Sequence, residues 1–193
     1  SIIEYPFSAV TFFMDMVCAL LFLTLLIKPL RDRSKLLFVM FCSLDRPEDR
    51  PLTLVWLYTQ FIASYLVLIP LLVYFESHDM LPLLMIIIIA NGVGDGLAEP
   101  LGIRFGKRKY TTYALFTKEK YVRSYVGSAC VFVTTFFAIL AFQQYFNSTQ
   151  LIVALITIPI LITLAEAFSP HTCDSPLIYA VGGVSMMSIV IFL

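Results

Sequence analysis

Long apolar runs recur along the chain, and the short segments between them hold most of its charged residues. A helix needs about 20 consecutive apolar residues to cross the hydrocarbon core of a bilayer. Six runs approach that length, and they cover 8–27, 53–75, 81–97, 124–146, 150–167 and 176–193. An open strand is unfavourable in hydrocarbon because its backbone polar groups stay unpaired. The pattern therefore predicts an all-α, polytopic integral membrane protein with about six transmembrane helices.

One further apolar segment, KLLFVMFCSL at 35–44, is too short to span the bilayer. We expect it to form a short interfacial or re-entrant helix. The sequence shows no internal repeat, low-complexity tract or flexible linker. A single transmembrane domain over 1–193 is therefore predicted.

The basic residues are confined to two of the predicted loops. All thirteen Lys and Arg lie between the first and second runs or between the third and fourth: Lys28, Arg31, Arg33, Lys35, Arg46, Arg50, Arg104, Lys107, Arg108, Lys109, Lys118, Lys120 and Arg123. Because two spans separate these loops, both lie on one side of the membrane, which the positive-inside rule makes cytoplasmic.

Composition agrees with a membrane protein. Of the 193 residues, 60% are hydrophobic and 13% are charged, and the mean hydropathy is +0.89. Soluble domains are nearer to half apolar. Thirteen acidic residues balance the thirteen basic ones, so the net charge gives no indication of a nucleic-acid partner, and none is expected.

Two carboxylates stand four residues apart at the end of the third run. If that helix continues to Pro100, Asp95 and Glu99 lie on one face, one turn apart. Mg²⁺ typically takes one or two protein carboxylates and completes its shell with water and substrate phosphates. Glycines around the pair, such as Gly94, would allow close approach of a phosphate. The alternative is a solvated helix end among glycines that serve helix packing.

Positive charge and hydroxyl groups follow. The segment RFGKRKY at 104–110 holds four cations, and RSYVGS at 123–128 opens the next run. Hydroxyls and backbone N–H groups at a helix N-terminus favour an anion. The alternative for the cations is binding of anionic lipid headgroups or a role in topology alone.

Other polar residues fall on the same predicted face. Glu166 interrupts an apolar run, and an ionisable residue within a span is a functional candidate, although it would also fit a residue that snorkels or pairs with a basic loop residue. Asp174 follows in a short loop. Arg46 and Arg50 lie in SLDRPEDRPL, which suits either a stiff solvated turn or arginines that bind phosphate.

The motifs GDGLAEPLGIRFGKRKY, RSYVGS and AEAFSPHTCDSPL, in this order between apolar runs, resemble those of the CTP-dependent membrane lipid kinases. That family includes dolichol or polyprenol kinase, phytol kinase and CTP-using diacylglycerol kinase, within the cytidylyltransferase-like superfamily. The resemblance covers 43–193. It implies that matching motif residues bind CTP: Asp95, Ala98, Gly102, Gly106, Arg123, Ser124, Gly127 and Ser128. It maps the family's late motif onto Glu166, Ala167, Ser169, Pro170 and Asp174.

The sequence departs from the family pattern at three points. Arg123 stands where lysine is usual, and Val126 stands where many members carry glutamate. The family's early basic-and-histidine motif is absent. One missing upstream span would return that motif to the cytoplasmic side, so either the chain is a fragment or it has lost part of the site.

The expected activity is phosphoryl transfer from CTP to the hydroxyl of an isoprenoid-type lipid alcohol, such as polyprenol, dolichol or phytol, at the cytoplasmic face. Mg²⁺ is assigned to Asp95 with Glu99 second, and either Glu166 or Asp174 orients or deprotonates the lipid hydroxyl. The residues expected to contact CTP are Gly94, Ala98, Gly102, Gly106, Lys107, Lys109, Arg123, Ser124, Gly127, Ser128, Arg46 and Arg50.

Three alternatives remain at this point. A phosphatidate cytidylyltransferase-like enzyme is disfavoured because its His-Gly-Gly and paired aspartates are not found. A non-catalytic membrane subunit would keep the fold without the reaction. A transporter would also use broken helices and intramembrane acids. Membrane lipids are expected partners, and a homo-oligomer or a larger membrane complex is left open.

Overall fold

The structure is a computed structural model that describes residues 9–45, 49–113, 120–170 and 173–193. Over these residues the chain is mostly helical. It divides into two compact units, Ser1–Leu66 and Val67–Leu193, whose boundary falls within helix α4 (Thr53–Ser77). We describe each unit by itself, and the single domain stays a prediction.

The described part of the first unit contains three α-helices and the start of α4. The three are α1 (Ala9–Leu25), α2 (Lys28–Arg31) and α3 (Lys35–Leu44). The Arg31 guanidinium lies 3.7 Å from the centre of the Phe41 ring, which ties α2 to α3. Helix α3 has the bounds predicted for the short apolar segment, and its place in the membrane interface stays a prediction.

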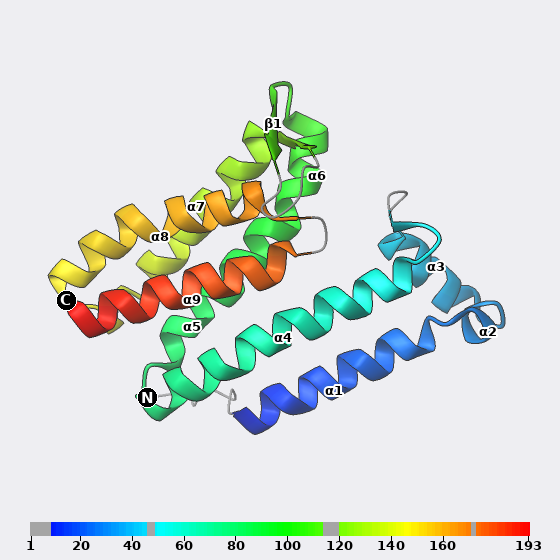
Figure 1. Ribbon diagram of the computed structural model, residues 1–193, viewed down its shortest axis with the longest axis horizontal. Helices are drawn as coiled ribbons and strands as arrows, with labels where there is room; N and C mark the ends of the chain where they lie inside the picture. The colour runs from blue at the N-terminus through cyan, green and yellow to red at the C-terminus, as the bar shows by residue number, and fades with distance from the viewer. Residues whose placement is uncertain (1–8, 46–48, 114–119, 171–172) are drawn as a thin grey trace. The chain divides into compact units, whose positions relative to one another are not determined.

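The second unit contains the end of α4 and all later elements. These are α5 (Leu81–Ile89), the π-helical segment η2 (Ala90–Asp95), α6 (Gly96–Phe105), β1 (Lys109–Tyr113), β2 (Lys120–Ser124), α7 (Tyr125–Ala141), the 3-10 turn η3 (Gln143–Tyr145), α8 (Ser148–Phe168) and α9 (Asp174–Phe192). Helix α8 packs between α7 and α9, and α6 packs against α7 (Figure 1). Large side chains from α4, α5, α7, α8 and α9 form the core: Phe75, Leu83, Ile87, Ile139, Ile158 and Met186.

Each predicted apolar run corresponds to a helix, but not every helix is long. Among the described residues, four helical segments are long and apolar enough to cross a membrane: Thr53–Ser77, Leu81–Phe105, Ser148–Phe168 and Asp174–Phe192. The helices of the first and fourth runs are shorter, at Val10–Leu25 and Tyr125–Ala141. A helical protein of the membrane type is therefore supported, and the count of six spans stays a prediction.

The third run continues further than the predicted end at residue 97. Segments α5, η2 and α6 form one continuous helical segment from Leu81 to Phe105 that passes through Pro100. The glycines and acidic residues after the run predict that the helix ends there. Instead, η2 keeps the segment helical in a π conformation, which is frequent at functional sites. The condition that places Asp95 and Glu99 one turn apart is therefore met.

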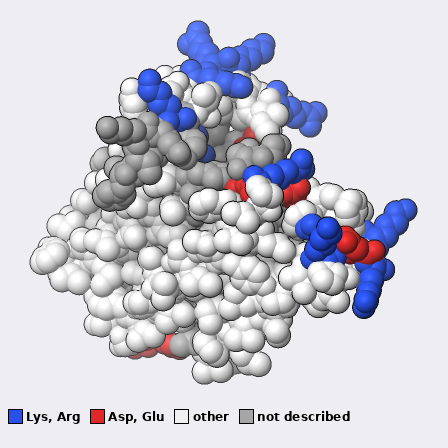
Figure 2. All heavy atoms as spheres, turned by 45° about the vertical axis from the view of Figure 1, so that its right-hand side comes forward, with Lys and Arg blue, Asp and Glu red and all other residues white. Residues whose placement is uncertain are grey.

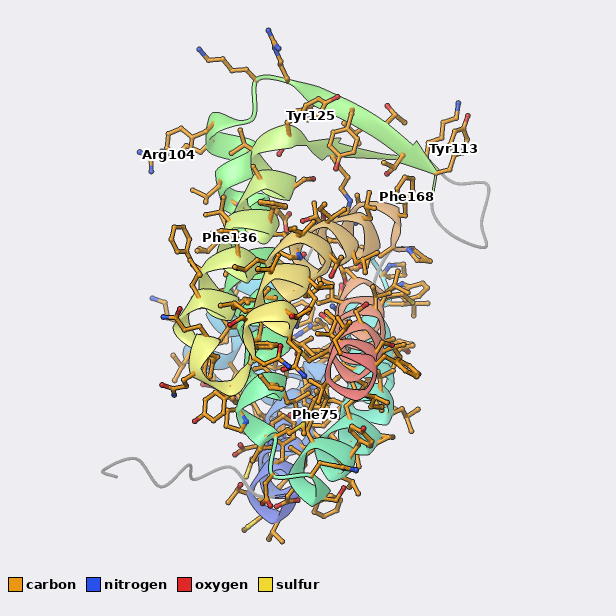
Figure 3. All side chains as sticks on the ribbon, turned by 90° about the vertical axis from the view of Figure 1, so that its left-hand side faces the viewer. Phe75, Arg104, Tyr113, Tyr125, Phe136 and Phe168 are labelled. Atoms are coloured by element: carbon orange, nitrogen blue, oxygen red, sulfur yellow. The ribbon has the colours of Figure 1, made fainter. Side chains whose placement is uncertain are left out.

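An antiparallel hairpin, which the sequence did not predict, joins α6 to α7. Strands β1 and β2 pair with Lys109 opposite Ser124 and Tyr113 opposite Lys120. Their sequences, KYTTY and KYVRS, contain the β-branched and aromatic residues that favour strands. The hairpin lies at one end of the helices of this unit (Figure 3).

Candidate functional site

The N-terminus of α7 is capped and closely packed. The Ser124 hydroxyl oxygen accepts a hydrogen bond of 3.0 Å from the Gly127 N–H, as an N-cap does. A Cβ at Gly102 would overlap the Ser124 hydroxyl, and a Cβ at Gly127 would lie 2.9 Å from the Ala98 carbonyl oxygen. Glycine at these positions lets α6 and α7 approach closely.

The same packing bears on the residues expected to contact CTP. The space beside Gly102, Gly106 and Gly127 is filled by the chain itself, and Gly94 packs against the backbone of Val131. The structure thus gives these glycines a packing role, and contact with a nucleotide stays a prediction. Gly96, on the same helical segment, has no atom within 4 Å of its Cβ position.

An ion pair between the half-buried Arg123 and the buried Glu166 joins β2 to the end of α8. Arg123 Nη1 lies 3.1 Å from Glu166 Oε1, with the two side chains 26% and 4% exposed. Arg123 Nη2 also donates to the Glu166 carbonyl oxygen and to the Ser169 hydroxyl, each at 3.3 Å. The sequence allowed Glu166 either to snorkel or to pair with a basic residue between the spans. The structure shows that it pairs with Arg123.

The ion pair leaves polar atoms unused. Arg123 Nε and Glu166 Oε2 are buried and have no hydrogen-bond partner among the described residues. Buried polar groups are nearly always hydrogen-bonded, because an unsatisfied one costs about 1–3 kcal/mol. Within the described residues, this cluster therefore keeps one donor and one acceptor without a partner.

The hairpin register decides which side chains face the helices. Tyr110 lies directly opposite Arg123, so these residues share one face, and Thr112 follows two positions along the strand. Thr112 donates a 2.8 Å hydrogen bond to the Ala167 carbonyl oxygen. The Tyr110 hydroxyl lies 2.5 Å from the Ser128 hydroxyl. Burial raises the pKa of Tyr110, against a smaller lowering by the Ser128 hydrogen bond.

A groove of about 450 Å³ lies where the hairpin meets the helices. Its walls come from β1, the first turn of α7 and the last two turns of α8: Tyr110, Thr111, Thr112, Tyr113, Tyr125, Ser128, Thr163, Leu164, Ala167 and Phe168. Figure 3 shows the labelled Tyr113, Tyr125 and Phe168 at this end of the unit.

The carboxylates are placed at helix positions that remain accessible. Asp95 is half-buried at the end of η2, and Glu99 is exposed in the first turn of α6. Asp174 begins α9, where its Oδ1 accepts from the Ser175 N–H at 3.2 Å. Within the described part of the chain, no three His, Cys, Asp or Glu residues are grouped to hold a metal ion. A magnesium site needs fewer protein ligands when phosphates complete the shell, so Asp95 with Glu99 stays a prediction.

The predicted cations are divided. Lys107 and Lys109 are exposed beside the hairpin, where Figure 2 shows Lys and Arg side chains gathered at the top of the view. Arg50 belongs to the first unit, where its Nε donates to Asp45 Oδ2 at 2.8 Å. Arg46 lies outside the described residues. The second unit by itself thus brings together the cations that follow α6, and not those of the early loop.

The sequence did not indicate two residues of the site. Tyr110 and Thr112 connect the hairpin to α7 and α8, and the alternation of residue types in KYTTY was the pattern that could have indicated them.

Comparisons of the chain with models of protein families, with curated proteins and with solved structures find no match.

Proposed function

We propose that the protein is a CTP-dependent kinase that phosphorylates the hydroxyl of an isoprenoid-type lipid alcohol at the cytoplasmic membrane face. The observation that carries the proposal is the Arg123–Glu166 ion pair, whose Nε and Oε2 atoms have no hydrogen-bond partner among the described residues. It lies where two segments that resemble motifs of such kinases meet: RSYVGS, at the end of β2 and the capped start of α7, and the end of α8. A half-buried arginine such as Arg123 suits a phosphate.

Phosphoryl transfer depends mostly on positioning and on stabilisation of charge. Asp95, with Glu99 second, would hold Mg²⁺, which neutralises phosphate charge when bound. Arg123 is assigned to the nucleotide phosphates, with Lys107 and Lys109 adding positive charge from the hairpin side. The half-buried Asp95 and the exposed Glu99 fit this role, since both must reach water and substrate.

The ion pair favours one assignment for the lipid hydroxyl. Glu166 uses Oε1 to hold Arg123, so we assign it the positioning of that cation. Asp174, at the start of α9, is then the better candidate for the group that orients or deprotonates the hydroxyl.

The test is a product assay on the purified protein in detergent. The protein is incubated with CTP, Mg²⁺ and farnesol, phytol, polyprenol, dolichol or diacylglycerol, and CDP is measured against pyrophosphate. We expect CDP and a phosphorylated alcohol, lost in Asp95→Asn and kept in the matched control Asp79→Asn. Pyrophosphate would instead identify a cytidylyltransferase, and neither product from any lipid would refute the kinase.

A non-catalytic membrane subunit is the second candidate. The specific observation in its favour is that Ser124 and the glycines Gly102, Gly106 and Gly127 are already used in helix capping and packing. Such a protein would keep the motif for its fold alone. It would bind no CTP, which equilibrium dialysis with labelled CTP measures directly.

A further inference from the structure

The groove between the hairpin and α8 has the chemistry of a site for a neutral hydrocarbon chain. Among the described residues that line it, none carries a charged side chain. Tyr113, Tyr125 and Phe168 are exposed, so three aromatic rings are available to a ligand. A volume of about 450 Å³ is within the range of roughly 300–1,000 Å³ found for small-molecule sites. A charged headgroup would find no partner on these walls.

The groove lies at the end of a candidate membrane span. Its α8 wall is formed by the last two turns of Ser148–Phe168, one of the four helices long enough to cross a bilayer. Leu164 is 46% exposed on this wall, so the groove opens toward the surroundings of the helix. Tyrosines at the groove, such as Tyr113 and Tyr125, are typical of the level where hydrocarbon meets water. A chain entering from the bilayer would therefore reach the groove sideways.

Hydroxyl groups mark one part of the groove. The Tyr110 and Ser128 hydroxyls lie 2.5 Å apart, and each keeps hydrogen-bonding capacity beyond this contact. The ion pair is close to them, because Tyr110 lies directly opposite Arg123 in the hairpin, and Arg123 pairs with Glu166. An alcohol hydrogen-bonded to these two hydroxyls would lie beside the Arg123–Glu166 ion pair.

We infer that this groove binds the carbinol end of the lipid alcohol, with the alcohol oxygen at Tyr110 and Ser128 and the hydrocarbon chain along Leu164 and Phe168. The inference rests on the proposed function for the identity of the ligand, but chain binding needs neither CTP nor Mg²⁺. It selects a neutral alcohol over a phospholipid, since the walls formed by described residues supply hydroxyls and rings and no charge.

The test is photolabelling without nucleotide. The full chain, in nanodiscs of phosphatidylcholine, is labelled with geranylgeraniol that carries a diazirine near its hydroxyl, and the labelled peptides are mapped by mass spectrometry. We expect label on 109–113 and 163–168. Leu164→Trp, which fills the groove, should lower this label at least fivefold. Leu161→Trp is the matched control, because Leu161 is 39% exposed on the same helix and does not line the groove.

A second variant tests the alcohol contact without filling the groove. Tyr110→Phe keeps the ring and removes the hydroxyl. Unlabelled geranylgeraniol should compete better than its methyl ether in the unaltered protein, by roughly two- to tenfold for one hydrogen bond. We expect this preference to disappear in Tyr110→Phe.

The outcomes separate this inference from the kinase proposal. Label spread evenly over the exposed helix faces, equal label in both tryptophan variants, or equal displacement by phosphatidylglycerol would each overturn the groove. CDP formation together with any of these results would leave the kinase standing and the groove wrong. Groove labelling without CDP formation would support the groove and refute the kinase.

Discussion

Replacement of Gly102 by alanine tests whether the motif glycines serve packing. Alanine is favoured over glycine in a helix by about 1 kcal/mol, and Gly96→Ala should show this gain where nothing lies within 4 Å of the new methyl group. At Gly102 the methyl group would overlap the Ser124 hydroxyl. If Ser124 turns away, α7 loses its cap, at about 0.5–2 kcal/mol. If it stays, α6 and α7 must separate, at about 1–3 kcal/mol.

The two variants lie on the same helix, so the gain in helix propensity cancels between them. We therefore expect Gly102→Ala to be less stable than Gly96→Ala by about 0.5–3 kcal/mol. In thermal unfolding in detergent, this corresponds to a Tm lower by roughly 1–12 °C. Circular dichroism at 222 nm follows the transition in both variants.

A double variant identifies the cause. In Gly102→Ala with Ser124→Ala, the new methyl group would meet the Cβ at position 124 at 3.5 Å and the Gly127 Cα at 3.9 Å, both ordinary contact distances. The penalty of Gly102→Ala should therefore shrink when Ser124→Ala is present. Equal Tm values for Gly96→Ala and Gly102→Ala, or an unchanged penalty in the double variant, would refute the packing argument. A raised KM for CTP in folded Gly102→Ala, without a change in Tm, would instead favour direct contact with the nucleotide.

Three further predictions concern polar contacts. Arg123→Met leaves the Glu166 carboxylate buried and unpaired, so we expect the free energy of unfolding to fall by about 3 kcal/mol. Most of this loss should be recovered in the double variant Arg123→Met with Glu166→Leu. Unfolding measurements in which the two single effects simply add would contradict this. Thr112→Val removes the hydrogen bond from the hairpin to α8 and should cost about 1–3 kcal/mol, whereas the exposed Thr111→Val should change Tm little. The hydrogen bond from Thr53, followed by that from Arg50, lowers the pKa of Asp45 from 3.8. The charged Asp45 carboxylate therefore stabilises the folded protein above pH 3.8, and this contribution is lost as the pH falls through the lower pKa of the folded state. The Tm difference between the protein and Asp45→Asn should shrink below about pH 4 and stay constant above about pH 6.

The helices were predictable because their signal is the length of an apolar run. Each of the six runs became a helix whose bounds differ from the prediction by a few residues, apart from the extension of the third run to Phe105 and the end of α7 at Ala141. Helix α8 begins where Asn147 and Gln150 cap each other. The end of the third helical segment could not be predicted from the sequence. Glycines, proline and charged residues usually end a helix, but here the helix continues through Pro100.

The site was predictable only in part. Individual residues such as Arg123 and Glu166 stood out by charge within or beside apolar runs, but their pairing joins positions far apart in the sequence. That pairing depends on the hairpin, which was hidden because segments 109–113 and 120–124 are short and lie in a charged stretch. Local pattern therefore identified the charged members of the site and missed Tyr110 and Thr112, whose roles follow from strand register.

The hairpin explains how the short motif RSYVGS contributes to three different structures. Arg123 is still in a strand, where its place opposite Tyr110 directs it to the end of α8. Ser124 is the cap at which strand becomes helix, and Ser128, one turn into α7, contacts the Tyr110 hydroxyl at the groove. A shift of the hairpin by one residue would turn Tyr110 and Arg123 to the opposite face and separate both from their partners. The close fit of Gly102 and Gly127 around Ser124 fixes the end of β2 and thereby prevents such a shift. On this argument the packing role of the glycines and a chemical role of the site are not alternatives, because the packing holds the ion pair and the groove hydroxyls in register.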